Sequence, residues 1–194
     1  MTTEPAEQLA ERRIRESIET QQALLDAPVP SAVARAAELI VDALRDGGTV
    51  LAFGNGGSAA DATHFAAELV GRYLLDRDGL PAVSLSDNPS AITAISNDYG
   101  YERVFARQVE ALGRAGDVAL GISTSGRSGN VLAALEAARA NGLTTVVLTG
   151  GDGRPAREAA DVCIAIPSAE TPRIQEGHTL VLHILCELVE RALN

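Results

Sequence analysis

The sequence predicts a three-layer α/β/α fold in which helices cover both faces of a parallel sheet of about five strands. Five short apolar runs alternate along the chain with segments whose apolar residues recur at helical spacing. Strands that read as continuous apolar runs are typical of a parallel sheet buried on both faces. The chain has 194 residues, enough for one domain with a substantial core, and no low-complexity segment divides it. We therefore expect a single domain over 1–194.

Two amphipathic helices are expected before the first strand. Residues 7–26 and 31–46 carry apolar side chains at helical spacing among charged ones. Ser31 is a candidate N-cap for the second helix, and Gly47-Gly48 is a candidate end for it. Because both helices lie outside the alternation of strands and helices, their apolar stripes need a partner. We expect the segment 1–48 to be used in packing between subunits.

The alternation of strands and helices starts at residue 49. The expected strands are 49–53, 82–85, 117–122, 144–148 and 162–166. The expected helices are about 58–75, 89–96, 101–112, a helix that ends at 141 and a closing helix over 172–193, with a short polar helix before the last strand.

Composition excludes several classes of function. The 26 acidic and 16 basic residues give a net charge of −10, and there are three Phe, three Tyr and no Trp. Such a chain offers neither a basic stripe nor a stacking platform, so we expect no nucleic-acid partner. All 16 basic residues are Arg. The absence of Lys excludes Schiff-base aldolases, pyridoxal phosphate enzymes and Walker-type nucleotide loops.

We expect a cytoplasmic protein with no membrane contact. No apolar run reaches the length of a membrane span, and the sequence begins with acidic and polar residues where a signal peptide would be basic and then apolar. Cys163 and Cys186 are isolated in apolar segments, far from any C-x-x-C spacing, and are expected to be buried free thiols.

Two polar turns follow the first and third expected strands. In a parallel sheet, ligands gather beyond the carboxyl ends of the strands, so the turns at 54–58 and 123–128 are expected to share one site. The second turn carries hydroxyls around Gly126, at Ser123, Thr124, Ser125 and Ser128. Hydroxyls and backbone N–H groups at the start of a helix can bind a phosphate monoester without Lys. A purely structural N-cap turn is the alternative.

The first turn reads G-N-G-G-S and superficially resembles the dinucleotide fingerprint. Ala59 stands where the third glycine or alanine of that fingerprint is read, and no clear acidic residue follows the next strand to bind a ribose. An NAD enzyme is therefore disfavoured. The glycines more simply allow a tight turn and the close approach of backbone to a sugar.

Histidine and carboxylate side chains suggest a metal site. His64 and Glu68 are four residues apart, which places them on one helical face. The closing helix carries Gln175, His178 and His183. Gln175 and His183 are separated by a helical rise of about 12 Å, so both reach one ion only if their side chains lean together. Sequence geometry does not choose between His178 and His183.

Four segments of the chain form a recognisable set. They are F-G-N-G-G-S-A-A-D-A-T-H-F-A-A-E-L (53–69), S-N-D-Y-G-Y-E-x-V-F-x-R-Q (96–108), S-T-S-G-R-S-G-N-V (123–131) and T-P-R-I-Q-E-G-H (171–178) with the later His183. In this order and spacing they resemble the phosphoheptose isomerases of the sugar isomerase (SIS) domain superfamily. The resemblance implies the SIS fold, a homotetramer with sites between subunits, and interconversion of sedoheptulose 7-phosphate with D-glycero-D-manno-heptose 7-phosphate.

The resemblance also implies roles for individual residues. The family's metal ligands fall on His64, Glu68, Gln175 and His183, which implies one zinc ion per subunit and selects His183 over His178. Its substrate contacts fall on Asn55, Gly56, Gly57, Glu68, Asn97, Asp98, Ser123, Thr124, Ser125, Ser128 and Gln175, and Asp61 and Arg72 match residues that line the family's site. The family usually reads D-A-Q-H where this chain has Thr63, a departure that bears on the sugar more than on the reaction.

An aldose–ketose isomerase must move a proton between C1 and C2, shuttle the oxygen protons and stabilise an enediolate. A divalent ion across O1 and O2 would stabilise that charge as a Lewis acid in a chain without Lys. Glu68 is the first candidate for the carbon base, and His183 for the acid that handles the oxygens or opens the ring. Because a coordinated group is a poorer base, Asp61 or Asp98 is the alternative for one role.

A second function is a non-catalytic SIS module. Such a module would be a sugar-phosphate sensor or would resemble the initiator-associating factors that bind the replication initiator. In those relatives the S-T-S-G turn and the late histidine are altered. Here Ser125 and His183 are present, which favours catalysis.

Overall fold

Five parallel strands form one sheet in the computed structural model, which describes residues 4–194. The strands are β1 (Val50–Gly54), β2 (Ala82–Ser84), β3 (Val118–Ser123), β4 (Thr144–Gly150) and β5 (Val162–Ile166). They lie in the order β2-β1-β3-β4-β5, with every neighbouring pair parallel. The predicted sheet is therefore confirmed in both its strand number and its direction.

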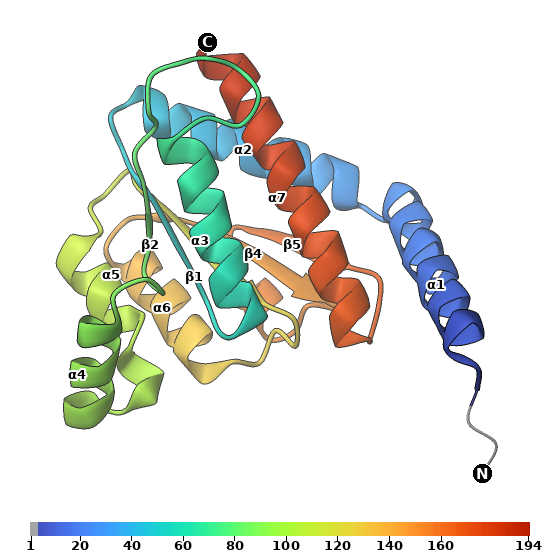
Figure 1. The fold of residues 1–194 in the computed structure, drawn as a ribbon. Helices are drawn as coiled ribbons and strands as arrows, with labels where there is room; N and C mark the ends of the chain where they lie inside the picture. Colours follow the sequence, from blue (N-terminus) through green and yellow to red (C-terminus); the bar gives the residue numbers. More distant parts are fainter. Residues whose placement is uncertain (1–3) are drawn as a thin grey trace.

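Helices cover both faces of the sheet (Figure 1). They are α1 (Ala6–Asp26), α2 (Val29–Arg45), α3 (Gly57–Val70), α4 (Pro89–Tyr99), α5 (Ala106–Leu112), α6 (Gly129–Ala140) and α7 (Thr171–Leu193), with short 3₁₀ helices η1 (Tyr101–Arg103) and η2 (Ala156–Ala159). One core lies between the sheet and α2, α3 and α7, and includes Ile40 and Phe65. The other lies between the sheet and α5 and α6, and includes Phe105 and Leu135. The three-layer α/β/α prediction is confirmed.

The order of the strands reverses between β1 and β3. The connection from β1 through α3 leads to β2 on one side, whereas β3, β4 and β5 follow one another on the other side. Right-handed crossovers in opposite directions place their helices on opposite faces, which explains why α3 and α6 belong to different layers. Such a reversal opens a crevice beyond the carboxyl ends of the two central strands. The turns at 54–58 and 123–128 lie on either side of that point.

Several predicted boundaries are wrong. The predicted helix over 58–75 ends at Val70. The predicted helix over 101–112 is η1 followed by α5, because the chain turns between them at 104–105. Ser31 is not an N-cap: α2 begins at Val29, and the Ser31 hydroxyl donates to the Pro28 carbonyl at 3.0 Å. The fixed φ angles of Pro28 and Pro30 start this helix earlier than the Ser-based rule predicts.

Both cysteines are free thiols, as predicted. Cys186 is buried, and its burial raises the pKa of the thiol to about 12. Cys163 is only half-buried, contrary to the prediction, because its strand β5 lies at the edge of the sheet. Its pKa is also raised, chiefly by burial.

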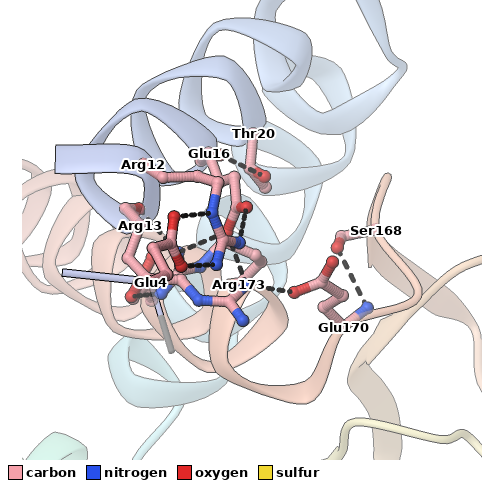
Figure 2. Close-up of polar contacts among 9 residues, drawn as sticks. Glu4, Arg12, Arg13, Glu16, Thr20, Ser168, Glu170 and Arg173 are labelled. Carbon is pink, nitrogen blue, oxygen red and sulfur yellow. Dashed lines mark hydrogen bonds and ion pairs between the residues drawn. The ribbon is translucent and has the colours of Figure 1, made fainter. Parts of the chain in front are cut away.

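The N-terminal helix α1 stands apart from the layered body and contacts α2 and α7 (Figure 1). Figure 2 shows the charged contacts that join it to α7. Arg173 of α7 donates to the Arg13 carbonyl at 2.7 Å and lies 3.7 Å from the Glu16 carboxylate, while Arg12 pairs with Glu4 and Glu16 within the N-terminal segment. Because the Arg12 and Arg13 pairs are largely exposed, each of them contributes little to stability. The Arg173 contacts join α1 to α7 and leave Ile14 and Ile18 exposed.

Candidate active site

The turns after β1 and β3 meet at the point where the strand order reverses. Asn55 and Asn130 join them through reciprocal amide hydrogen bonds of 2.8 and 2.9 Å. Gly56 and Gly126 have φ angles of 58° and 64°, which only glycine adopts without strain. Because the turns are tight, α3 and α6 begin directly after the ends of β1 and β3. Their N-termini therefore face the same crevice.

The second turn presents hydroxyl groups that its own helix does not use. Ser128 is the residue before α6, yet its side chain caps no backbone N–H of the helix. Its Oγ lies 3.0 Å from the Ser123 Oγ instead. The Ser125 hydroxyl is exposed and accepts the Arg127 N–H at 3.2 Å. This arrangement disfavours the N-cap alternative for Ser128 and leaves hydroxyls and N–H groups available to an anion.

His64, Glu68 and His183 lie together where α3 and α7 pack against each other. The His64 Nε2 is 3.0 Å from the Glu68 Oε1, and the His64 ring meets the His183 ring edge-on with centroids 5.1 Å apart. Gln175 lies against the first residue of α3, because a Cβ added to Gly57 would overlap the Gln175 amide. Helices α3 and α7 thus bring His64, Glu68 and His183 together, and they place Gln175 at the first turn of α3.

His178 has a different place in the structure. It is fully buried, and its Nε2 donates to the Thr149 carbonyl at 3.1 Å. Burial lowers the pKa of His178 to about 4, although the Thr149 carbonyl opposes this effect. The choice that sequence spacing left open therefore has a geometric answer: His183 adjoins His64, and His178 is bound at the end of β4.

Asp61 lies one turn before His64 on the same face of α3. It accepts a hydrogen bond of 3.4 Å from the Thr179 hydroxyl, while its Oδ2 is buried and has no hydrogen-bond partner among residues 4–194. Burial raises the pKa of Asp61, and the Thr179 hydrogen bond and the neighbouring His64 act against it. A half-buried carboxyl with a free oxygen beside an imidazole is a candidate for proton transfer.

Three predicted residues are not drawn into this cluster. Asn97 and Asp98 lie on α4, are exposed, and hydrogen-bond to each other at 2.8 Å. Arg72 is exposed just after α3. Within residues 4–194 no hydrogen bond or ion pair joins these three side chains to the two turns or to His64.

The donor chemistry of the cluster suits zinc. Two imidazoles, a carboxylate and an amide are nitrogen and oxygen donors of the kind that zinc accepts. In the part of the chain that the structure describes, no three His, Cys, Asp or Glu side chains are already arranged around one point as a metal cage. Glu68 hydrogen-bonds with the neighbouring imidazole of His64 instead.

Two site residues escape sequence analysis. The Tyr73 ring packs on His183 with centroids 5.5 Å apart, but residues 71–75 read as a continuation of α3. Asn130 is 4% exposed at the start of α6, and its partner Asn55 is 75 residues away. A buried amide in an apolar helix signals a polar partner, but not which one.

The model of the SIS domain family matches residues 12–150. A phosphoheptose isomerase from Roseiflexus sp. (strain RS-1) is 53% identical over 180 residues, covering 93% of this chain and 91% of the relative. The structure of the phosphoheptose isomerase GmhA from Neisseria gonorrhoeae is 43% identical and superimposes with a TM-score of 0.91, covering 96% of this chain and 100% of that one. A phosphoheptose isomerase from Francisella tularensis, 36% identical, gives 0.93 over 97% of this chain and 100% of its own.

This chain belongs to the phosphoheptose isomerase family. As a family member it is an enzyme, an aldose–ketose isomerase, which decides against the non-catalytic SIS module. The likeness extends over the whole layered body and both turns, so the SIS fold implied by the motifs is confirmed. No helix among residues 4–194 is long and apolar enough to cross a membrane.

Proposed function

We propose that this phosphoheptose isomerase family member interconverts sedoheptulose 7-phosphate and D-glycero-D-manno-heptose 7-phosphate. The observation that carries the proposal is the cluster of His64, Glu68 and His183 between α3 and α7. The turn at 123–128 of the same chain presents hydroxyl groups suited to a phosphate. Relatives that are named phosphoheptose isomerases at 53% identity support the choice of sugar.

The turn at 123–128 binds the 7-phosphate in this proposal. The Ser123 and Ser128 hydroxyls already face each other, and the exposed Ser125 hydroxyl lies between them in sequence. In a chain with a net charge of −10, the N-terminus of α6 supplies a local positive potential. The opposite turn, with Asn55, Gly56 and Gly57, contacts the sugar.

Glu68 and His183 carry the proton transfers. Glu68, 25% exposed and facing His64, takes the proton from C1 of the ketose and returns it to C2. His183 handles the protons of the two oxygens or opens the ring. Asp61 is the alternative base, because burial raises its pKa and its Oδ2 has no partner. Asp98 can take part only if α4 or a neighbouring subunit brings it to the substrate.

We further propose that His64, Glu68, Gln175 and His183 hold one zinc ion. When bound, zinc supplies Lewis-acid stabilisation of the negative charge that develops on the sugar oxygens. His64, Glu68 and His183 lie together between α3 and α7, and Gln175 comes from the same helix as His183. The chain has no Lys to supply a cation instead. Cobalt, nickel or manganese can substitute, because the set contains no thiolate.

We also propose that the enzyme works as a cytoplasmic homotetramer with sites between subunits. Apolar side chains of α1 are exposed in the single chain, which supports association through the N-terminal segment. Neighbouring subunits could also place Arg72, Asn97 and Asp98 beside a site.

The test is incubation of the purified protein with sedoheptulose 7-phosphate, followed by NMR detection of the aldose product. Conversion confirms the reaction, and no conversion by a folded, zinc-loaded protein refutes it. Protein that a chelator has rendered metal-free should lose turnover and regain it on zinc addition. Full activity in verified metal-free protein would contradict the metal proposal and leave a Glu68–His183 acid–base pair.

A further inference from the structure

A buried ion pair joins the loop after α3 to the C-terminal part of α7, and no step of the proposed reaction uses it. Arg77 follows α3 and Glu190 is near the end of α7, and their side chains are 4% and 1% exposed. The Arg77 Nε donates to the Glu190 Oε1 at 3.1 Å. Taking two charges out of water is costly, so such a pair stabilises a fold only when all its hydrogen bonds are made.

Glu190 fixes the loop that follows α3. Its two carboxylate oxygens accept three successive backbone N–H groups, from Tyr73, Leu74 and Leu75, at 3.0, 2.8 and 2.8 Å. With the bond from Arg77 the carboxylate has four donors, all of them charge-assisted hydrogen bonds. The conformation of 73–75 is therefore determined by a single side chain from another helix.

Arg77 fixes the end of α3. Its Nη2 donates to the Glu68 carbonyl at 2.9 Å, and its Nη1 donates to the Leu69 carbonyl at 2.9 Å and to the Asp78 carbonyl at 2.8 Å. The last carbonyls of a helix have no partner within it, and a cation there also complements the helix dipole. The guanidinium thus holds the backbone of Glu68 itself.

Both halves of the pair lead to the site. Arg77 binds the carbonyl of Glu68, whose side chain faces His64. Glu190 binds the N–H of Tyr73, whose ring packs on His183. His183 and Glu190 are seven residues apart on α7, a rise of about 10 Å, so one helix carries both the imidazole and the carboxylate that places its aromatic neighbour.

We propose that Arg77 and Glu190 are positioning residues for the isomerase: together they hold Glu68 and, through the Tyr73 ring, His183 in the arrangement that zinc binding and proton transfer require. This role deepens the proposed function and rests on it. It places two residues outside the ligand set among the determinants of turnover, with no contact to the substrate.

The experiment compares Glu190→Gln and Arg77→Lys with a matched control. Gln turns an amide NH₂ toward backbone donors, and Lys keeps the charge but cannot make the fork of hydrogen bonds. The control is Asp117→Asn, because Asp117 is also buried and accepts two backbone N–H groups, from Thr49 and Arg114, just before the central strands β1 and β3. Each variant is assayed for kcat, KM, zinc affinity and thermal stability.

We expect both test variants to lose kcat and zinc affinity by about 10- to 100-fold, which is typical of residues that orient metal ligands. KM for the sugar phosphate should stay within about threefold, since the turn at 123–128 lies on β3 and α6. Asp117→Asn should lower the melting temperature and leave kcat and zinc affinity unchanged. If the test variants behave like this control, the pair is only structural and the proposal is wrong.

A readout without metal or substrate tests the same idea. The chain has only three histidines, so the ring signals of His183 can be followed by NMR in metal-free protein. Tyr73→Leu identifies the signals that depend on the Tyr73 ring. Arg77→Lys should shift the same signals, and Asp117→Asn should not. Arg77→Lys also covers the case in which Glu190→Gln fails to fold, because it leaves the buried carboxylate with a cation.

Failure of the positioning role and failure of the proposed function are distinguishable. If wild-type protein isomerises the sugar phosphate and both variants match it, only the positioning role fails. If zinc-loaded wild-type protein has no isomerase activity, the proposed function fails. The positioning role is then tested by the zinc affinity and the His183 NMR signals of the variants. Unchanged His183 signals in Arg77→Lys would reject it in either case.

Discussion

At the residue scale, the hydroxyls of the second turn make the phosphate hypothesis testable. Replacing Ser125 and Ser128 together by Ala should raise KM for the phosphorylated sugar tenfold or more, because a hydrogen bond to a charged group contributes about 1.5–3 kcal/mol. The change should fall mainly on KM, since neither hydroxyl adjoins Glu68 or His183. Steady-state kinetics with sedoheptulose 7-phosphate measure it.

Ser168→Ala is the matched control for that experiment. The Ser168 hydroxyl accepts the Glu170 N–H at 3.2 Å, the same local geometry that Ser125 has with Arg127. Losing one such turn contact elsewhere should leave KM unchanged. If the double variant also keeps the KM of the wild-type protein, the phosphate binds at another place.

The two histidines of α7 should respond differently to replacement by Ala. His183→Ala should abolish turnover and stoichiometric zinc binding, because it removes the imidazole beside His64. His178→Ala should cost little of either, since His178 binds the Thr149 carbonyl. Because His178 is buried, His178→Ala should also lower the free energy of unfolding by about 2–4 kcal/mol, through the cavity it leaves and the Thr149 carbonyl it leaves unpaired. Zinc analysis, kinetics and urea unfolding of both variants give the three quantities. Loss of zinc from a folded His178→Ala protein would contradict this assignment.

His178 also predicts how stability depends on pH. Its pKa is about 4 in the folded protein and about 6.5 when exposed, so between these values the unfolded chain binds more protons. The free energy of unfolding should therefore fall as the pH drops from 6.5 toward 4, by up to about 1.4 kcal/mol per pH unit for this one proton. Above pH 6.5 the contribution is constant.

A variant that does not titrate isolates this effect. His178→Asn keeps a donor for the Thr149 carbonyl, so the difference in unfolding free energy between wild type and variant should shrink as the pH falls below 6.5. Urea unfolding at several pH values measures this difference. A difference that is independent of pH would mean that His178 titrates normally.

The role of a site residue could be predicted from sequence where it depends on local spacing, but not where it depends on a partner far away in the chain. The spacing of His64 and Glu68 gave their shared face, and the structure shows their contact. The choice of His183 over His178 needed the crossing of α3 and α7. Thr63, the departure from the family pattern, binds Ser84 and Asp87 in a groove of about 610 Å³ between α3 and the segment after β2. Only the fold could reveal those partners.

At the element scale, apolar periodicity located every helix and strand but misplaced the ends that tertiary contacts determine. Leu74 and Leu75 continue the helical pattern of α3, yet their N–H groups bind Glu190, more than a hundred residues later. Breaking the helix at Val70 lets the loop reach that carboxylate. A local pattern contains no information about such an acceptor, which is why the predicted helix ran to 75.

The first residue of α3 gives a prediction about helix packing. Gly57→Ala should weaken zinc binding and lower kcat, because the added Cβ overlaps the Gln175 amide and pushes α7 or its side chain away. Gly129→Ala is the control: it is the first residue of α6, and its Cβ would lie 3.5 Å from Glu102, an ordinary contact. Measuring the zinc affinity of both variants tests this prediction. If Gly57→Ala binds zinc as tightly as Gly129→Ala, the Gln175 side chain moves aside freely and the prediction is wrong.

At the scale of the whole molecule, sequence predicted the architecture because burial on both faces leaves a clear apolar pattern in each strand. It did not predict the order β2-β1-β3-β4-β5, which depends on the direction of each crossover. That order is what brings the turns after β1 and β3 together. The shared position of the two turns could still be predicted, because any parallel sheet places its strand-to-helix turns at one edge.

The N-terminal helix gives the prediction for the assembly. Ile14, Ile18 and Leu25 of α1 are 61%, 50% and 77% exposed, an apolar surface that a monomer would leave in water. We expect a homotetramer at micromolar concentration by light scattering. Replacing Ile14 and Ile18 by Asp should dissociate it, since each charge would be buried without a partner in an apolar interface. The same substitution at Leu112, 52% exposed on α5, should leave the assembly intact. A monomer in the wild-type protein would refute the tetramer, and an intact tetramer in the Ile14/Ile18 variant would place its interface away from α1.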